Sequence, residues 1–125
     1  MHPLKVYKAS AGSGKTFTLA VEYIKLLIAD PYVYKHILAV TFTNKATAEM
    51  KDRILQHLYG ISKGLDSSQG YLEKLMEKLK AEGIQITEEE IRRRSGKALS
   101  MILHDYSRFR VETIDSFFQS ILRTL

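Results

Sequence analysis

The chain has 125 residues, 45% of them hydrophobic and 26% charged, which is ordinary for one folded domain. It contains no cysteine, and this excludes a disulfide framework and a thiolate metal site. No apolar run is long enough for a signal peptide or a membrane span, so we expect a cytoplasmic protein without a membrane partner. The formal net charge of +5 favours a polyanionic partner such as nucleic acid, but does not establish one.

The first predicted elements are a strand over residues 4–8 and a glycine-rich loop. The loop fits the phosphate-binding pattern G-x-x-x-x-G-K-[ST], except that Ala9 replaces the first glycine. Its glycines let the backbone approach phosphate, Lys15 can reach the β- and γ-phosphates, and Thr16 can hold Mg²⁺. The alternative is a turn before a helix, with Lys15 merely solvated. The predicted nucleotide-binding residues are Ala9, Ser10, Ala11, Gly12, Ser13, Gly14, Lys15 and Thr16.

A helix and a second strand follow the loop. Apolar residues recur at helical spacing from Thr16 to Ala29, and Asp30-Pro31 is expected to end this helix. The nearly continuous apolar run Ile37–Phe42 is typical of a buried parallel strand. Strand, helix and strand form a right-handed βαβ unit, whose ligand site lies beyond the carboxyl ends of the strands.

The second strand leads into a polar segment and then into a helix that reaches about Tyr59. Met50, Ile54 and Leu58 give the helix an apolar seam. The polar segment has two interpretations. It can be a plain helix cap made by Thr43 or Asn44, which the spacing alone favours, or a nucleic-acid contact with an aromatic for base stacking. Its residues are Thr41, Phe42, Thr43, Asn44, Lys45 and Ala46.

Residues 60–108 are expected to be a flexible connection over 60–70 followed by two helices. The first helix covers about 71–81 and ends at Gly83. The second opens with a capping box at Thr87 and has a seam of Ile91, Ala98, Leu99, Ile102 and Tyr106. The run Arg92-Arg93-Arg94 is either a nucleic-acid contact or, more simply, a solvated face paired with the acidic residues one turn earlier.

The last predicted elements are a strand over Arg108–Thr113 and a helix from about Ser116. The helix has one apolar face and runs to the last residue without a cap, which is typical of a piece of a longer protein. The apolar face consists of Ile114, Phe117, Phe118, Ile121, Leu122 and Leu125.

Three stretches together resemble the UvrD/Rep type of superfamily 1 DNA helicases. Ala9–Thr16 resembles their motif I, and Thr41–Ala46 resembles motif Ia. The segment Thr113–Phe117 resembles the next motif, T-x-H-S-F. The opening Ala-Ser-Ala and the long helical insertion are most similar to the RecB/AddA helicase-nuclease branch. The resemblance covers about residues 4–59 and 109–125.

The resemblance implies an α/β fold, namely a RecA-like P-loop NTPase domain with a partial parallel sheet and a helical insertion. Residues 1–59 would be the first part of the motor domain, 60–108 the insertion and 109–125 the return to the motor domain. The implied ligands are ATP and Mg²⁺, with Lys15 and Thr16 in the catalytic role and Thr16 on the metal. Single-stranded DNA would meet the segment from Thr41 to Lys45, with Phe42 as the stacking residue, together with Thr113, Ser116 and Phe117.

The implied parent is an ATP-dependent helicase of recombination repair, with further motor domains and a possible helicase-nuclease partner subunit. Three departures limit this chain. Asp115 replaces the usual histidine and is expected to cap the last helix beside a Ser116–Gln119 capping box. An adenine-selecting segment upstream of motif I is absent. The acidic D-E-x-x motif and the arginine that stabilises the transferring phosphoryl group are absent too. We therefore expect weak nucleotide binding and no turnover from the chain alone. The alternatives are a non-catalytic nucleic-acid-binding module or another P-loop NTPase, such as a small-molecule kinase.

Overall fold

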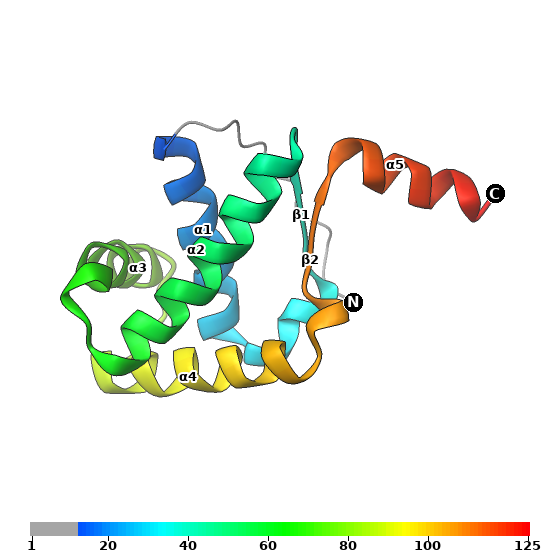
Figure 1. The fold of residues 1–125 in the computed structure, drawn as a ribbon. Helices are drawn as coiled ribbons and strands as arrows, with labels where there is room; N and C mark the ends of the chain where they lie inside the picture. Colours follow the sequence, from blue (N-terminus) through cyan, green and yellow to red (C-terminus); the bar gives the residue numbers. More distant parts are fainter. Residues whose placement is uncertain (1–12) are drawn as a thin grey trace.

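A computed structural model describes the backbone of residues 13–125 and the side chains from Thr16 onward (Figure 1). The predicted strand over 4–8 and the loop residues 9–12 lie outside this range, as do the side chains of Ser13, Gly14 and Lys15. The described residues form a helix-rich α/β structure with a two-stranded parallel sheet.

The sheet confirms the prediction of parallel strands joined by a long connection. Strand β1 (Leu38–Thr41) pairs with β2 (Arg110–Thr113), and the register runs from Leu38 opposite Arg110 to Thr41 opposite Thr113. All four residues of β1 are buried, as its apolar sequence predicts. Because the register has no offset, the carboxyl ends of both strands lie at one edge.

Helix α1 (Ser13–Ala29) is the central helix and is buried on nearly all sides. Asp30 ends it as predicted, because the Asp30 carboxylate accepts a hydrogen bond from the backbone N–H of Tyr32 and opens the 3₁₀ turn η1 (Pro31–His36). The buried lysine of α1, Lys25, is 6% exposed and forms ion pairs with Glu22 and Glu82. Sequence periodicity could not reveal this cluster, because Glu82 comes 57 residues later.

Helix α2 (Asn44–Lys63) starts as predicted but is longer than predicted. The Thr43 hydroxyl accepts a hydrogen bond from the N–H of Ala46, and Met50, Ile54 and Leu58 are fully buried. The flexible connection predicted over 60–70 is wrong. Gly60 is a buried helical residue, and the helix ends only at Gly64, which has φ +69°.

Glycine is needed at position 60 for close approach rather than for a turn. A Cβ placed there would lie 1.9 Å from Ser68 Oγ. Ser68 belongs to the 3₁₀ turn η2 (Asp66–Ser68), which leads directly into α3 (Gln69–Ala81). The predicted helix over 71–81 is confirmed, with its start two residues earlier.

Helix α4 (Glu88–His104) confirms the predicted cap, since the Thr87 hydroxyl accepts a hydrogen bond from the N–H of Glu90. Ile91, Ala98 and Ile102 are fully buried as predicted. Tyr106, predicted as the last residue of the seam, is instead 45% exposed. The helix ends at His104, so Tyr106 falls in the 3₁₀ turn η3 (Tyr106–Arg108), before β2.

The four helices α1 to α4 share one hydrophobic core. Helices α1 and α2 run side by side, α4 crosses their lower ends in Figure 1, and the strands lie on the far side of α2 from α3. Leu75, Leu79 and Ile91, all from the predicted insertion, join this core together with Ile24 and Ile54. The insertion is therefore packed against the segment that follows the loop.

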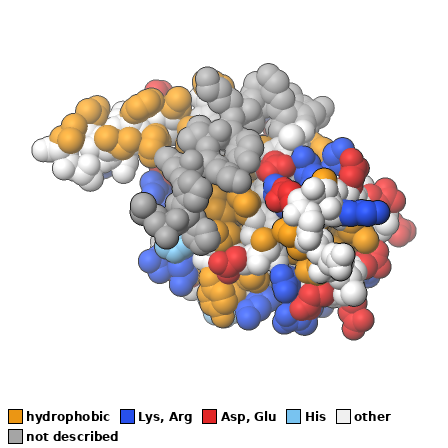
Figure 2. Space-filling view, turned by 180° about the vertical axis from the view of Figure 1, so that it is seen from behind, with side chains coloured by type: hydrophobic (Ala, Val, Ile, Leu, Met, Phe, Trp, Pro, Cys, Tyr) orange, Lys and Arg blue, Asp and Glu red, His pale blue; other side chains and the backbone are white. Residues whose placement is uncertain are grey.

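Helix α5 (Ile114–Arg123) projects away from the rest of the molecule, and none of its residues is buried (Figures 1 and 2). The cap predicted at Asp115 is wrong. Thr113 is the N-cap, because its extended backbone leaves β2 and its hydroxyl accepts a hydrogen bond from the N–H of Ser116. Among the described helices, none has the length and apolar character that a membrane crossing requires.

Candidate nucleotide and nucleic-acid site

Most described parts of the predicted site lie on the side of the molecule where the two strands end. Strands β1 and β2 end together, at Thr41 and Thr113, and each is followed by a helix that starts at this edge. The start of α1 lies on the same side of the molecule (Figure 1). Helix N-termini present unpaired N–H groups and the positive end of the helix dipole, which favours anions such as phosphates.

Thr16 is the part of the predicted nucleotide site whose side chain is described. It lies in the first turn of α1 and is 1% exposed. Phe17 follows it directly and packs edge-on against Tyr71 of α3, with ring centroids 4.7 Å apart. The first turn of α1 is thus held from the side by a residue of the predicted insertion.

Thr41 is the innermost residue of the predicted DNA-binding segment. It is 1% exposed, and its hydroxyl lies 2.5 Å from the hydroxyl of Thr47 in α2. The backbone carbonyls of Thr43 and Glu112 are 3.3 and 3.4 Å away. The Thr41 side chain therefore joins the end of β1 to α2 and to β2.

The four residues after Thr41 are exposed at the same edge. Phe42 is 52% exposed, so its ring is accessible to a ligand at the end of the buried strand β1. Thr43 uses its hydroxyl for the α2 cap, which confirms the cap interpretation for this residue. Asn44 and Lys45 are exposed in the first turn of α2. One turn thus presents a ring, an amide and an ammonium group to solvent.

The second predicted DNA-binding segment is arranged differently. Thr113 is half-buried and caps α5, and Ser116 is exposed. Phe117 is half-buried and lines a pocket of about 280 Å³ together with residues at the opposite, amino end of the strands. The aromatic side chains of Phe42 and Phe117 therefore have different surroundings.

The pocket beside Phe117 brings together basic residues that the sequence analysis did not select. Lys35 and His36 come from η1, and Arg110 is the first residue of β2. These residues are far apart in the sequence and meet only because the two strands pair in parallel. Only the predicted pairing of the two strands could have indicated from the sequence that these basic residues lie close together.

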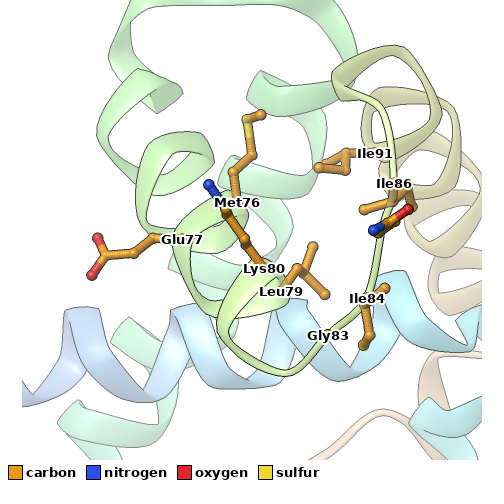
Figure 3. A pocket seen from close by; sticks show the side chains of 9 residues that line it. Met76, Glu77, Leu79, Lys80, Gly83, Ile84, Ile86 and Ile91 are labelled. Atoms are coloured by element: carbon orange, nitrogen blue, oxygen red, sulfur yellow. The ribbon is translucent and has the colours of Figure 1, made fainter.

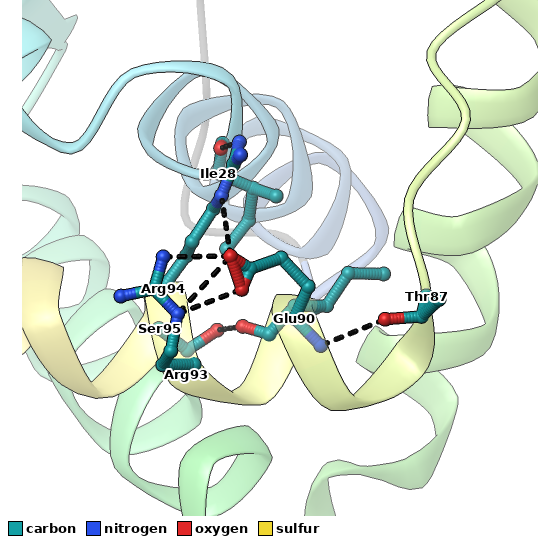
Figure 4. Close-up of polar contacts among 7 residues, drawn as sticks. Ile28, Thr87, Glu90, Arg93, Arg94 and Ser95 are labelled. Atoms are coloured by element: carbon teal, nitrogen blue, oxygen red, sulfur yellow. Dashed lines mark hydrogen bonds and ion pairs between the residues drawn. The ribbon is translucent and has the colours of Figure 1, made fainter.

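The three arginines of the run in α4 form ion pairs with glutamates of the same helix, some of which Figure 4 shows. Arg92 pairs with Glu88, and Arg93 and Arg94 pair with Glu90, which confirms the predicted pairs one turn apart. The hydrogen bond from Arg93 holds the pKa of Glu90 below its ordinary value. In addition, Arg94 Nη1 donates to the carbonyl of Ile28 at 2.7 Å and satisfies an acceptor near the end of α1.

A further hollow of about 630 Å³ lies between the end of α3, the 83–87 connection and the start of α4 (Figure 3). The side chains of Leu79, Ile84 and Ile91 make its wall mostly apolar. None of the residues predicted to bind nucleotide or DNA lines this hollow.

Comparison with known proteins gives a family match over almost the whole chain. The family described as the UvrD/REP helicase N-terminal domain matches residues 2–125. The RecBCD enzyme subunit RecB of Buchnera aphidicola is 43% identical over 70 residues, covering 47% of this chain and 6% of that protein. RecB of Escherichia coli is 40% identical over 63 residues, covering 44% of this chain and 5% of that protein.

The ATP-dependent DNA helicase Rep of Escherichia coli is also similar. It is 50% identical over 50 residues, covering 40% of this chain and 7% of Rep. The chain therefore spans only 5 to 7% of the length of these relatives. No solved structure matches the chain significantly.

Proposed function

The chain belongs to the UvrD/REP helicase N-terminal domain family, and on this premise we propose that it binds ATP and contacts single-stranded DNA within an ATP-dependent DNA helicase. The observation that carries the proposal is the convergence at one edge. The start of α1 and the ends of β1 and β2 lie on the same side of the molecule, and the family match includes all three. In parallel sheets this edge is the usual ligand site.

For the nucleotide half of the site, we assign ATP to the loop Ala9–Thr16. Backbone N–H groups of the loop would cradle the phosphates, and Lys15 would neutralise the β- and γ-phosphates. Thr16, in the first turn of α1, would offer its hydroxyl to Mg²⁺. Bound Mg²⁺ would supply charge neutralisation at the phosphates.

For the DNA half of the site, we assign the turn Phe42–Lys45 to the strand. Phe42 would stack on a base, whereas Asn44 and Lys45 would contact the backbone. Thr41 is buried, so its role in the proposal is to hold this turn against α2 and β2. At the neighbouring strand end, Thr113 and Ser116 would flank the same strand of DNA. Phe117 lines the pocket at the amino end of the strands, so a DNA contact by Phe117 rests on the motif resemblance alone.

The parent protein in this proposal is a RecA-like motor of the recombination-repair helicase-nuclease type. Residues 1–59 and 109–125 would belong to its first motor domain and 60–108 to a helical insertion. The RecB relatives are subunits of a complex by name, which supports a partner subunit for the parent. ATP-driven movement along DNA would require the remaining motor domains.

The nucleotide assignment is tested by titrating Mg-ATP into the ¹⁵N-labelled chain and following backbone amide shifts, which detect millimolar binding. The expected result is saturable shifts in the first turn of α1 that are lost in Lys15→Ala. The matched control is Lys80→Ala, which removes an exposed lysine of α3 far from this edge. If wild-type protein and Lys15→Ala bind Mg-ATP equally well, the assignment of ATP to the loop Ala9–Thr16 is wrong.

A further inference from the structure

The start of α1 and the helix α2 are joined by three rings in contact, those of Phe17, Tyr71 and His57. The Phe17 and Tyr71 rings meet edge-on, with centroids 4.7 Å apart and planes at 68°. The Tyr71 and His57 rings are parallel, with centroids 3.6 Å apart and planes at 10°. Since Phe17 is in α1, Tyr71 in α3 and His57 in α2, this aromatic stack crosses three helices.

The far end of the aromatic stack is fixed by a buried hydrogen bond. His57 Nδ1 lies 2.8 Å from Ser68 Oγ, and both residues are buried. Gly60 makes this contact possible, because any side chain there would occupy the place of the serine hydroxyl. Burial, and then the charge of Arg53, lower the pKa of His57, which favours the neutral form of the ring.

The two ends of the aromatic stack belong to the two halves of the proposed site. Phe17 directly follows Thr16, the last residue of the nucleotide-binding loop. His57 belongs to α2, the helix whose first turn carries Asn44 and Lys45. An α-helix is a stiff rod over this length, so a ring packed against its later turns constrains the direction of its start.

We propose that Tyr71 is a positioning residue that holds the first turn of α1 in a fixed place relative to α2, and thereby couples nucleotide binding to DNA binding. This inference rests on the proposed function and assigns part of the helical segment 60–108 to that same site. Without the Tyr71 ring, Phe17 loses its edge-on partner and α1 loses this contact with α3. The first turn of α1 then responds less to what α2 binds, because only the direct packing of α1 against α2 remains.

The test is the effect of oligothymidylate on Mg-ATP affinity, measured by amide-shift titration with and without the oligonucleotide. Coupling between two ligands is reciprocal and is given by the ratio of the two dissociation constants. The variant is Tyr71→Leu, and the matched control is Tyr23→Leu. Tyr23 is a similarly buried tyrosine that packs edge-on against Phe109, with centroids 5.7 Å apart, so both changes remove one ring from the same core.

We expect oligothymidylate to change the Mg-ATP dissociation constant of the wild-type protein, and to change that of Tyr23→Leu by the same factor. In Tyr71→Leu that factor moves toward one, and Mg-ATP affinity drops by at most about tenfold, the limit reached if the whole energy of one aromatic pair acts on the nucleotide site. Tyr71→Phe keeps the ring and should keep the coupling. Phe17→Leu removes the other ring of the pair and gives a second variant with the same expected loss.

The positioning role would be overturned if Tyr71→Leu or Phe17→Leu showed the same coupling factor as the wild-type protein. It would also be overturned if Tyr23→Leu lost as much coupling as Tyr71→Leu. This failure can be told apart from a failure of the proposed function. If the wild-type protein binds no Mg-ATP, the proposed function fails and this inference falls with it. If the wild-type protein shows the coupling and the Tyr71→Leu variant keeps it, the inference alone fails.

Discussion

At the scale of single residues, Gly60 and Ser68 show how one absent side chain determines a helix contact. Gly60→Ala would place a methyl carbon 1.9 Å from Ser68 Oγ and 2.8 Å from Ser68 Cβ. The expected loss is about 1–3 kcal/mol of unfolding free energy, because the core must shift to accept the new atom. The intrinsic helix preference of alanine, up to about 1 kcal/mol, only partly offsets it.

Gly70→Ala is the matched control for Gly60→Ala. Gly70 is in the first turn of α3, and an added Cβ there would meet no atom within 4 Å. We expect neutral or slightly higher stability for this variant, and urea unfolding measures both changes. An equal loss of stability in the two variants would contradict the close contact between Gly60 and Ser68.

Glu22 is the residue whose ionisation is expected to matter most for stability. Its carboxylate is 2.9 Å from both Lys25 Nζ and Lys78 Nζ. Burial raises its pKa, but the hydrogen bonds and charges of these lysines outweigh burial and hold the pKa below the ordinary 4.5. The pairs therefore stabilise the protein above about pH 4.5, and this stabilisation is lost as the pH falls through the lowered pKa.

Glu22→Gln should cost about 1–3 kcal/mol at pH 7, because it leaves the buried Lys25 with one carboxylate instead of two. The difference from wild-type protein should shrink as the pH drops below 4.5. Thermal unfolding as a function of pH measures this, with Glu77→Gln as the exposed control. A difference that stays constant down to pH 3 would disprove the role given to the ionised carboxylate.

At the scale of elements, α5 and α4 make opposite use of apolar residues. Phe118 and Leu122 in α5 are 54% and 66% exposed, whereas Ile102 in α4 is fully buried. Leu122→Ala and Phe118→Ala are therefore expected to change the unfolding free energy by less than about 0.5 kcal/mol. Ile102→Ala should cost about 2–5 kcal/mol. Urea unfolding distinguishes these outcomes, and a large loss for Leu122→Ala would mean that α5 packs against the core in solution.

The sequence predicts most elements but not all of their boundaries. Apolar periodicity locates α1, α2, α3 and α4 correctly, and local capping chemistry identifies Thr87 as the N-cap of α4. For α2 it leaves Thr43 and Asn44 as candidates, and the structure selects Thr43. The flexible connection was wrongly predicted at Gly60 because glycine occurs both in turns and at close contacts between helices. Only the position of Ser68 shows that Gly60 is of the second kind. The cap of α5 was predicted at Asp115 and lies instead at Thr113, because the chain leaves β2 at Thr113 with an extended backbone that local capping patterns do not reveal.

At the scale of the whole molecule, the parallel pairing of β1 and β2 brings the segments after Thr41 and Thr113 to the same edge of the sheet. The predicted order of strands and helices was sufficient to expect that edge. Local sequence patterns could not reveal the basic lining beside Phe117 or the Lys25–Glu82 ion pair, because each joins residues more than fifty positions apart. Such contacts depend on tertiary packing, which local sequence patterns do not contain.

In the proposed function, the carboxyl edge of the sheet carries single-stranded DNA beside the nucleotide. The most direct test of this proposal is the affinity of the chain for a fluorescent oligothymidylate over a range of salt concentrations, with Phe42→Ala, Lys45→Ala and the control Lys80→Ala. We expect Phe42→Ala to weaken binding by about 1–3 kcal/mol, and Lys45→Ala to weaken it and lower the salt slope by about one. Mg-ATP binding should be unchanged in all three. If Phe42→Ala and Lys45→Ala bind DNA as the wild-type protein does, the edge is not the DNA site and the account is wrong.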